Sequence, residues 1–387
     1  MLSRRTTLAT IGGTLLLPTG RALAQAPAQA PGKVLKLGAL CTQTGPSASI
    51  GKESITGLTY GVKKLNDAGG VRIGSDTYRI ELVNVDDESK TERGVAGAER
   101  LINEDRVSLL FTPPNSSGTL AILPIAEKNK VPAISFVSAA QPVISPEYTF
   151  SFRSTLSSVM NVSPAVDFLV RTKEAKKLAF LGRNDDWGRT ASGQIKSRSK
   201  ELGATVVADE YFEVGSMDFY GLLTKIRAAG PDAVLIACYI EDGLSLMKQY
   251  RELQMKPVVM GLGVIWSSPT FMKSAGRNVE GIFLSTGPTT SESPELAEFG
   301  AELQKATGHP ALPYEVTAYD NLMMALAAMK KAGSIEGAKV RDAMRNFEYK
   351  GLLQTYRFGA TGQSAVQINI NEVKNNRPVV LSSVDAS

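Results

Sequence analysis

The sequence is poor in the residues on which catalysis and metal binding most often depend. It contains one histidine and two cysteines in 387 residues, so a Ser-His-Asp triad would rest on His309 alone. No multi-histidine metal site or disulfide scaffold is available. The sequence also lacks a G-x-x-x-x-G-K-[ST] phosphate loop, a G-x-G-x-x-G turn after a strand and a G-x-S-x-G nucleophile elbow. We therefore expect a protein that is not an enzyme, with no catalytic residue, no metal and no cofactor.

The chain also lacks a strong charge of one sign. Its formal net charge is +5, but residues 1–24 hold three arginines and no acid, which leaves 40 basic and 38 acidic residues in the remainder. No polybasic run survives this subtraction, so we expect no nucleic-acid partner. Hydrophobic residues make up 43% and charged residues 21%, the balance of a soluble globular protein. The length suffices for two or three domains.

Residues 1–24 have the features of an export signal. A pair of arginines precedes the short apolar stretch Leu8–Pro18, and Ala22-Leu23-Ala24 supplies the small residues of a cleavage site. The apolar stretch is too short to span a bilayer, which takes about 20 residues. The arginine pair leaves both the twin-arginine and the general secretory route open. With residues 25–32 as a flexible lead-in, we predict a periplasmic protein.

Strands and helices alternate along the rest of the chain. Most predicted strands are continuously apolar, which is typical of strands covered on both faces. Alternating β and α units predict parallel sheets with helices on both faces, and nine or more strands exceed one open sheet. We therefore predict an α/β fold with two doubly wound, Rossmann-like lobes. The predicted strands are Val34–Leu40, Arg79–Val85, Val107–Thr112, Ala133–Val137, Lys177–Leu181, Thr205–Ala208, Ala233–Cys238, Val258–Gly261 and Gly281–Ser285.

The two cysteines fall on predicted strands of different lobes. Cys41 and Cys238 are therefore expected to be buried and to act as small apolar residues. A disulfide between them is the alternative in an oxidising compartment.

Three polar loops follow predicted strands of the first lobe. They span residues 42–47, 113–119 and 138–142. Ligands of doubly wound sheets bind outside the carboxyl ends of the strands. Ser116 or Ser117 can cap a helix whose first N–H groups would receive an anion, and the small residues Ala139 and Ala140 let a ligand approach the backbone. Ordinary helix capping explains any one loop, but three in one lobe favour a carboxylate-binding cleft edge.

A series of short motifs follows in a fixed order along the chain. They are Gly38-Ala39-Leu40 with Thr44-Gly45-Pro46, Ala68-Gly69-Gly70-Val71, Asp86-Asp87, Ser116-Ser117 with Pro124-Ile125-Ala126-Glu127, Val131-Pro132-Ala133-Ile134-Ser135, Asp185-Asp186-Trp187-Gly188 and Ala318-Tyr319-Asp320. In this order the chain, from about Val34 to Gly362, resembles the type I periplasmic solute-binding proteins of the branched-chain amino-acid ABC transporter family. The motifs are specific for the family but not for a ligand.

The resemblance implies two lobes that close on a solute and present it to an ABC permease in the inner membrane, with the binding protein as a monomer. Three crossovers would join the lobes, near Phe150–Arg153, Thr286–Pro288 and Leu352–Tyr356. The first lobe would hold residues 33–153 and 288–351, and the second lobe residues 154–287 and 352–387.

The resemblance also implies where the solute lies. Ser116 would give its hydroxyl to the ligand carboxylate, and Ser138–Ala140 would give backbone N–H groups. Trp187 stands where the family often has Tyr, on the opposing lobe. The residues expected to contact the ligand are Thr44, Ile50, Ser116, Ser117, Ser138, Ala139, Ala140, Trp187, Tyr239, Glu241 and Gly263.

Two departures from the family pattern bear on the ligand. Ala140 replaces a Thr that is usual in amino-acid binders, and the loop Leu262–Trp266 has no acid to pair with an ammonium. Burying an unpaired ammonium is costly, although Glu241 could substitute. We therefore predict a small organic carboxylate without an α-amino group, aromatic acids included. A branched-chain or other hydrophobic amino acid, a ligand-sensing subunit and an enzyme are the alternatives. The aromatic side chains expected to enclose the ligand are Phe111, Phe136, Trp187 and Trp266.

Overall fold

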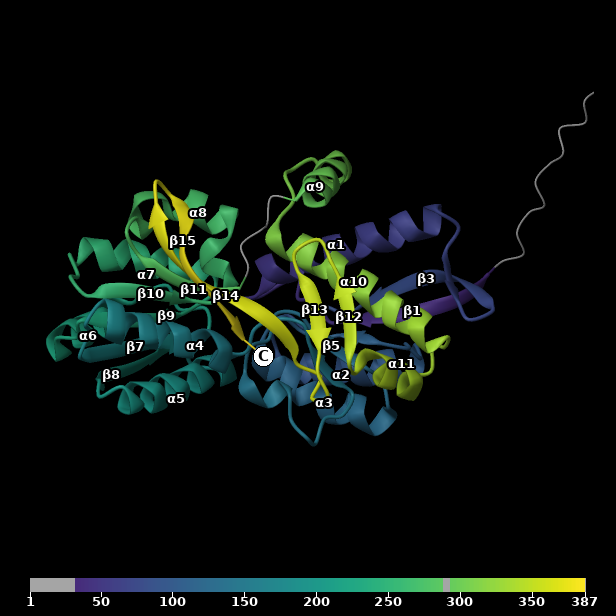
Figure 1. Ribbon diagram of the computed structural model, residues 1–387, viewed down its shortest axis with the longest axis horizontal. Helices are drawn as coiled ribbons and strands as arrows, with labels where there is room; N and C mark the ends of the chain where they lie inside the picture. The colour runs from purple at the N-terminus through teal and green to yellow at the C-terminus, as the bar shows by residue number, and fades with distance from the viewer. Residues whose placement is uncertain (1–31, 288–292, 387) are drawn as a thin grey trace, which may run out of the picture.

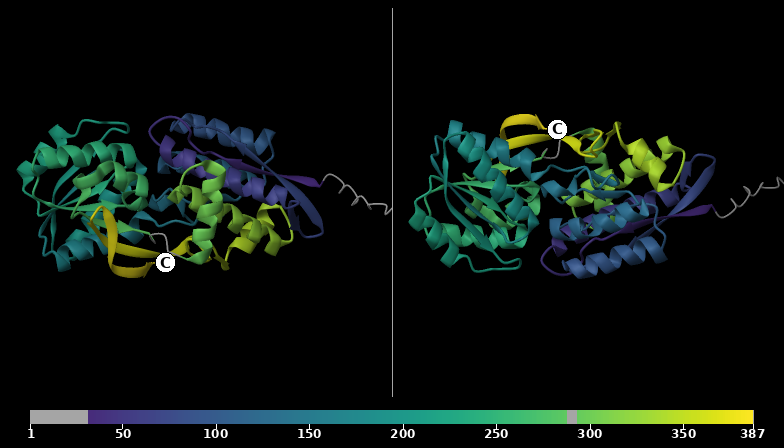
Figure 2. Two further views of the ribbon diagram at one scale, coloured as in Figure 1. Left: turned by 90° about the horizontal axis from the view of Figure 1, so that it is seen from above. Right: turned by 90° about the horizontal axis from the view of Figure 1, so that it is seen from below.

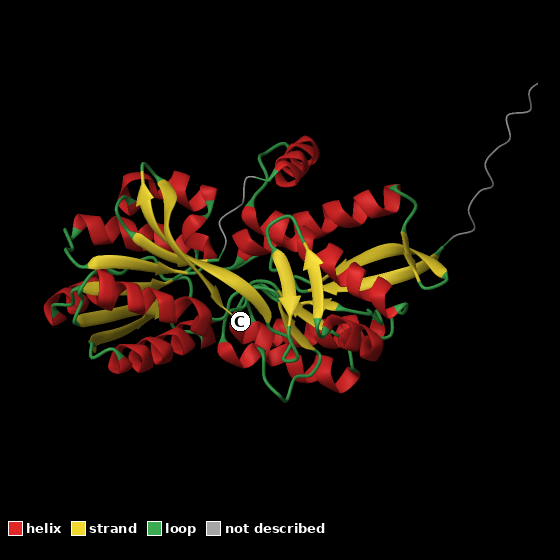
Figure 3. Cartoon of the chain, in the orientation of Figure 1, coloured by secondary structure: helices red, strands yellow, loops and turns green. Residues whose placement is uncertain are grey.

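The computed structural model describes residues 32–287 and 293–386. The predicted export signal, residues 1–24, and all but the last residue of the predicted lead-in lie outside the described residues. Two lobes lie side by side along the longest axis of the molecule (Figures 1 and 2). Each lobe is a sheet flanked by helices (Figure 3), which confirms the predicted α/β class with two doubly wound lobes.

The first lobe is built on a six-stranded sheet in the order β2-β3-β1-β4-β5-β6. β2 and β3 form an antiparallel hairpin, and the other neighbours are parallel. The strands are β1 (Lys33–Ala39), β2 (Val71–Ile73), β3 (Asp76–Asn84), β4 (Leu110–Phe111), β5 (Ala133–Ser135) and β6 (Ser151–Arg153). The helices of this lobe are α1 (Ala48–Asp67), α2 (Thr91–Glu99), α3 (Ser116–Asn129), α9 (Pro294–Thr307), α10 (Pro313–Ala332) and α11 (Gly337–Met344).

Apolar side chains on both faces of this sheet explain its layers. Leu35 and Leu37 of β1 belong to the core cluster that contains Leu58 of α1 and Leu322 of α10. Leu110 of β4 belongs to a second cluster, which contains residues of α2 and α3. The sheet is therefore covered on both faces, as continuously apolar strands predict.

The second lobe is built on a mixed sheet in the order β12-β13-β14-β11-β10-β9-β7-β8, with β15 paired to β14. The parallel part holds β7 (Lys177–Arg183), β8 (Thr205–Phe212), β9 (Ala233–Ala237), β10 (Val258–Leu262) and β11 (Phe283–Thr286). The antiparallel part holds β14 (Ser364–Lys374) and β15 (Arg377–Ala386). Its strands β12 (Phe347–Lys350) and β13 (Thr355–Phe358) extend the sheet to the first lobe and pack against the core of that lobe. The helices of this lobe are α4 (Ser158–Asp167), α5 (Asp186–Glu201), α6 (Tyr220–Ala229), α7 (Ile240–Glu252) and α8 (Pro269–Ala275).

The chain passes between the lobes after β6, after β11 and along β14 (Figure 1). At the third passage, Tyr356 and Phe358 still pack in the core of the first lobe, whereas Val366 and Ile368 pack in the core of the second. This passage lies a few residues later than the predicted crossover at Leu352–Tyr356. Of the predicted second crossover, residue 288 lies outside the described residues.

Each of the nine predicted strands overlaps an observed strand. Cys41 and Cys238 are buried and unpaired with each other, in the cores of different lobes. None of the helices within residues 32–287 and 293–386 combines the length and the apolar character that crossing a membrane requires.

Candidate functional site

The lobes face each other across a cleft, and α3 begins at its edge in the first lobe. Asn115 caps this helix, because its side-chain oxygen accepts the N–H of Gly118 at 2.6 Å. Ser116, the first helical residue, is 2% exposed, and its Oγ accepts the N–H of Ala140 at 3.2 Å. The Ser116 hydroxyl hydrogen therefore stays free to donate. The first turn of α3 contains no acid, so its N-terminus favours an anion.

Two carbonyl groups of the loop after β5 are occupied by hydrogen bonds within the protein. The Ala139 carbonyl accepts hydrogen bonds from Ser158, at 2.7 Å from its N–H and 3.0 Å from its Oγ. The Ala140 carbonyl accepts a hydrogen bond from Nη1 of Arg153 at 2.6 Å. The Ser138 hydroxyl is buried and lies 3.2 Å from the carbonyls of both Pro113 and Asn115. These contacts fix the loop next to Ser116, whose Oγ accepts the N–H of Ala140.

Arg153 places a buried positive charge behind this loop. Its side chain is 1% exposed, and its Nε donates to the side-chain oxygen of Gln363 at 2.6 Å. No carboxylate of the described residues lies within 4 Å of its guanidinium. Burial lowers the pKa of Arg153 to about 9, so the group remains charged at neutral pH. The first lobe thus carries an uncompensated cation next to the cleft.

The second lobe offers stacked aromatic rings instead. Trp187, at the start of α5, stacks on Tyr239 with ring centroids 5.6 Å apart. Gly263 faces this stack with a φ of +96°, and a Cβ there would lie 3.5 Å from Trp187. Glycine suits the position because other residues rarely adopt that φ. The wall is therefore flat and apolar.

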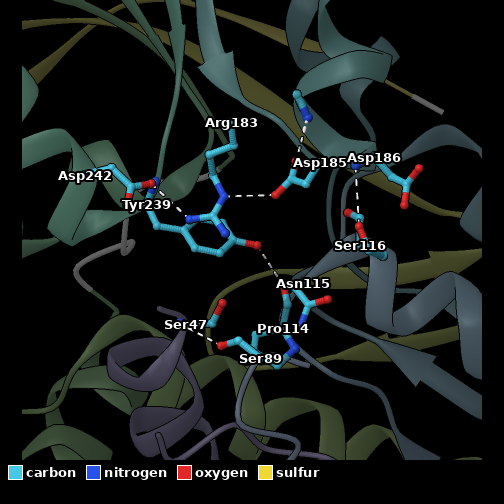
Figure 4. A network of polar contacts seen from close by, with 12 residues as sticks. Ser47, Ser89, Pro114, Asn115, Ser116, Arg183, Asp185, Asp186, Tyr239 and Asp242 are labelled. Atoms are coloured by element: carbon cyan, nitrogen blue, oxygen red, sulfur yellow. Dashed lines mark hydrogen bonds and ion pairs between the residues drawn. The ribbon is translucent and has the colours of Figure 1, made fainter. Parts of the chain in front are cut away.

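A buried ionic cluster supports the Tyr239 ring from behind (Figure 4). The guanidinium carbon of Arg183 lies 3.9 Å from the ring centroid, and its nitrogens contact Asp185 and Asp242 at 2.9 Å each. Burial by itself lowers the pKa of Arg183, but Tyr239 and the two carboxylates outweigh it and hold the pKa above its ordinary value. The hydroxyl of Tyr239 donates to the carbonyl of Pro114 across the cleft at 3.2 Å, so the two lobes are in contact.

Two neighbouring cavities open between the lobes. The small one, about 30 Å³, is lined by Ser116, Val137, Ala139, Thr155, Leu156, Trp187, Tyr239, Gly263, Val264, Ile265 and Tyr314. None of these lining side chains carries a charge at neutral pH. The larger one, about 380 Å³, lies beside the crossovers and shares Thr155, Leu156, Val264 and Tyr314 with the first.

Five of the residues predicted to contact the ligand line the small cavity. They are Ser116, Ala139, Trp187, Tyr239 and Gly263. Ser138 and Ala140 lie directly behind them and hold the loop in place. The Ser117 hydroxyl accepts the N–H of Asp186 from the second lobe at 3.5 Å.

Like Ser117, Ser138 and Ala140, the remaining three predicted residues line neither cavity. The hydroxyl of Thr44 donates to Asp86 at 2.8 Å. Ile50 of α1 packs into the core cluster of the second lobe. Glu241 has one carboxylate oxygen that is buried without a hydrogen-bond partner among the described residues. These residues lie at the contact between the lobes or beside it, and a direct ligand contact stays a prediction for each.

Two of the four aromatic residues expected to enclose the ligand were assigned wrongly. Trp266 and Phe111 are fully buried in the cores of the second and first lobes. Trp266 packs against Gly261 and Phe271 because its strand-end loop turns inward. Trp187 and Phe136 do line cavities, the small and the larger one respectively.

Sequence reasoning missed Tyr314 and Arg183. Tyr314 comes from the start of α10, 51 residues after Gly263, which is the predicted ligand residue nearest to it in the sequence. An aromatic residue directly after Pro313, at a helix start, was the available signal. Arg183 was detectable as a charged residue at the end of the apolar strand β7, followed two residues later by Asp185.

A buried carboxyl group lies at the contact between the lobes. Glu53 of α1 is 7% exposed and accepts the N–H of Tyr314 at 3.2 Å. Burial raises its pKa to about 7; Glu315 and Glu241 also raise it, while the Tyr314 N–H and His309 lower it. Across residues 32–287 and 293–386, no cluster of three or more His, Cys, Asp or Glu side chains could hold a metal ion.

Comparisons with known proteins agree on one family. The family model described as periplasmic binding protein matches residues 34–378. An amino acid binding protein of Pseudomonas aeruginosa is 25% identical over 311 residues, which cover 80% of this chain and 82% of that protein.

Solved structures show the same fold. A leucine binding protein from Thermotoga maritima superposes with a TM-score of 0.80 and 23% identity, covering 91% of this chain and 99% of that one. A solute binding protein of an ABC transporter from Rhodopseudomonas palustris, in complex with 3,4-dihydroxybenzoic acid, superposes with a TM-score of 0.81 and 22% identity, covering 91% and 98%.

Proposed function

This chain belongs to the periplasmic binding protein family, and on that premise we propose that it captures a small organic carboxylate between its lobes for an ABC uptake transporter. The proposed protein is exported, acts as a monomer in the periplasm and delivers its solute to a permease of the inner membrane. Its role is to bind the solute by closure of the two lobes, without a chemical reaction.

The observation that carries the choice of ligand is the charge of the cavity wall. Ser116 and the N-terminus of α3 offer donors to an anion, and no acidic side chain lines either cavity. An α-ammonium group would be buried there without a carboxylate, which is unfavourable by several kcal/mol. A carboxylic acid without an amino group meets no such penalty.

The known ligands of structural neighbours fit both an acid and an amino acid. The Rhodopseudomonas palustris protein holds an aromatic acid, and a protein from Streptococcus pneumoniae with a TM-score of 0.80 holds isoleucine. The buried, unpartnered oxygen of Glu241 is the feature that favours the second candidate, a hydrophobic amino acid. We favour the acid because Glu241 does not line the small cavity.

The lobes close because the solute contacts both of them. A ligand shifts an open–closed equilibrium only by its differential affinity for the closed form. The carboxylate would bind Ser116 and the loop of Ala139 in the first lobe, and the body would lie against Trp187 and Tyr239 in the second. Contacts to both walls exist only in the closed form, which is the form a permease would recognise.

Calorimetric titration tests the proposal. We expect benzoate-type acids to bind at least tenfold more tightly than leucine or valine. Ser116→Ala should weaken acid binding about tenfold or more, because a hydrogen bond to a charged group contributes about 1.5–3 kcal/mol. Trp187→Ala should weaken it by a similar factor, whereas Thr56→Ala, whose hydroxyl donates to the carbonyl of Lys52 within α1 and which lines neither cavity, serves as the matched control. Tighter binding of leucine by tenfold would reverse the choice of ligand.

A further inference from the structure

The larger cavity is not used by the carboxylate contacts proposed above. It measures about 380 Å³, against about 30 Å³ for the small cavity. A water molecule needs about 10–15 Å³ on this scale, so the small cavity holds about two or three waters. Packed interiors contain few voids larger than a water, and ligand pockets measure about 300–1,000 Å³. The larger cavity is therefore of ligand size and is not a packing defect.

The two cavities are adjacent. Leu156, Val264 and Tyr314 line both of them. A solute whose carboxylate binds at Ser116 and whose body passes between these three side chains extends into the larger cavity. Most of the volume available to a solute thus lies beside the crossovers, beyond the part of its body that lies against Trp187 and Tyr239.

Resting on the proposed function, we propose that the larger cavity holds the far end of the solute, and that the solute is an elongated organic acid with a second anionic or hydrogen-bond-accepting group opposite its carboxylate. The chemistry of the wall supports this class. Its sides are largely apolar, with Phe136 and Tyr356 among the lining residues, which suits a hydrocarbon or aromatic body.

The lining of the cavity also includes a basic residue and polar residues. Arg377, at the start of β15, is exposed and is the one charged residue among those lining the cavity, and no carboxylate of the described residues lies within 4 Å of it. Gln354 also lines the cavity, and its Nε2 donates to the carbonyl of Ser154 at 3.2 Å. A guanidinium is suited to a planar carboxylate, which it can bind through two parallel hydrogen bonds.

Two lining positions, on different elements, allow the cavity to be filled. Gly287 has no positive φ, and a Cβ there would lie 3.5 Å from both Leu156 and Val264, an ordinary contact. Gly287→Leu therefore places a side chain beside the passage between the cavities, and Gly287→Ala is its matched control. Thr317 lies on α10, half-buried, with its hydroxyl bonded to the carbonyl of Pro313 at 2.8 Å, and Thr317→Phe fills the cavity from the other side.

The test is calorimetry with three probes: benzoate, 3-phenylpropanoate and 4-(2-carboxyethyl)benzoate. We expect wild type to bind the two longer acids at least tenfold more tightly than benzoate, with the diacid tightest. Gly287→Leu and Thr317→Phe should each remove that preference while benzoate affinity changes less than threefold. Gly287→Ala should behave as wild type, and Arg377→Gln should abolish only the advantage of the diacid.

The outcomes separate this inference from the function on which it rests. Equal affinity for all three acids in wild type, or filling variants that weaken benzoate as much as the longer acids, would overturn the inference and leave the capture of carboxylates intact. Binding of leucine but of none of the three acids would contradict the proposed function itself. Circular dichroism of each variant shows whether it is folded. Because Gly287→Leu and Thr317→Phe fill the cavity from different elements, one of them still gives the decisive measurement if the other does not fold.

Discussion

Both lobes place a buried arginine behind the cleft, but the two arginines are held in different ways. Arg183 in the second lobe contacts two carboxylates, Asp185 and Asp242. Arg153, at the end of β6 in the first lobe, donates to the uncharged oxygens of Ala140 and Gln363. The two carboxylates therefore neutralise the charge of Arg183, whereas no carboxylate of the described residues lies within 4 Å of Arg153.

The difference between the two arginines makes the two walls of the cleft chemically different. The first lobe combines the uncompensated cation, the N-terminus of α3 and the Ser116 hydroxyl, all of which favour an anion. The second lobe uses its paired charges to hold Tyr239 in place under Trp187. One wall would thus select the charge of the solute, and the other would cover its body.

The largest effect we expect comes from exchanging each arginine for methionine. Arg183→Met leaves Asp185 and Asp242 buried without a counter-charge, which should lower the free energy of unfolding by about 3–5 kcal/mol. Arg153→Met leaves only neutral acceptors unpaired, and we expect a loss of about 1–3 kcal/mol. Urea unfolding of both variants measures the two losses under the same conditions.

The comparison predicts that Arg183→Met loses more stability than Arg153→Met. An equal loss in both variants, or a larger one for Arg153→Met, would show that the two arginines are not held differently. Ligand titration gives a second readout, because Arg153→Met should also weaken the binding of an acid.

The layered part of the fold could be predicted from the sequence, whereas the C-terminal strands could not. Continuous apolar runs such as Ala233–Ala237 are buried on both faces and leave a clear signal. β14 mixes polar and apolar residues, and β15 is exposed along almost its whole length, with Val379 at 42% and Val384 at 48%. Neither strand has the pattern of a strand buried on both faces. Their antiparallel pairing with each other defines them instead.

The candidate site divides in the same way. Ser116 and Ala139 follow strands directly, and local sequence places them at a sheet edge. The support of Tyr239 by Arg183 joins residues 56 positions apart, and Tyr314 arrives only after the second crossover. Such contacts depend on the order of the strands in the sheet, and local sequence patterns do not give this order.

A smaller effect concerns Glu53, the buried carboxyl group of α1 that accepts the N–H of Tyr314. Its pKa is raised from 4.5 to about 7, so the folded protein holds a proton that the unfolded chain releases in this interval. The stabilisation is complete below about pH 4.5 and is lost as the pH rises through 7, up to about 3 kcal/mol in all. Glu53→Gln should remove this dependence and unfold at higher urea than wild type at pH 8.

Unfolding at pH 5 and at pH 8 provides the measurement for Glu53. Glu302→Gln is the control, because the exposed Glu302 has a lowered pKa, chiefly from the hydrogen bond with Lys64, and its removal should not flatten the fall between the two pH values. A wild-type protein that is equally stable at both pH values, with no difference from Glu53→Gln, would mean that Glu53 is charged in the fold.

The smallest effect concerns the two hydrogen bonds that join the walls directly. Tyr239 donates to the carbonyl of Pro114 at 3.2 Å inside the cleft, whereas Ser117 accepts from Asp186 at 3.5 Å in an exposed position. Tyr239→Phe keeps the stacked ring and loses only the buried bond, which should weaken ligand binding about three- to tenfold, or about 1 kcal/mol. Ser117→Ala should change affinity less than twofold, because water can replace a long exposed contact. Calorimetry with the same acid compares the two variants. If Ser117→Ala weakened binding as much as Tyr239→Phe, closure would depend on the rim of the cleft and not on its aromatic wall.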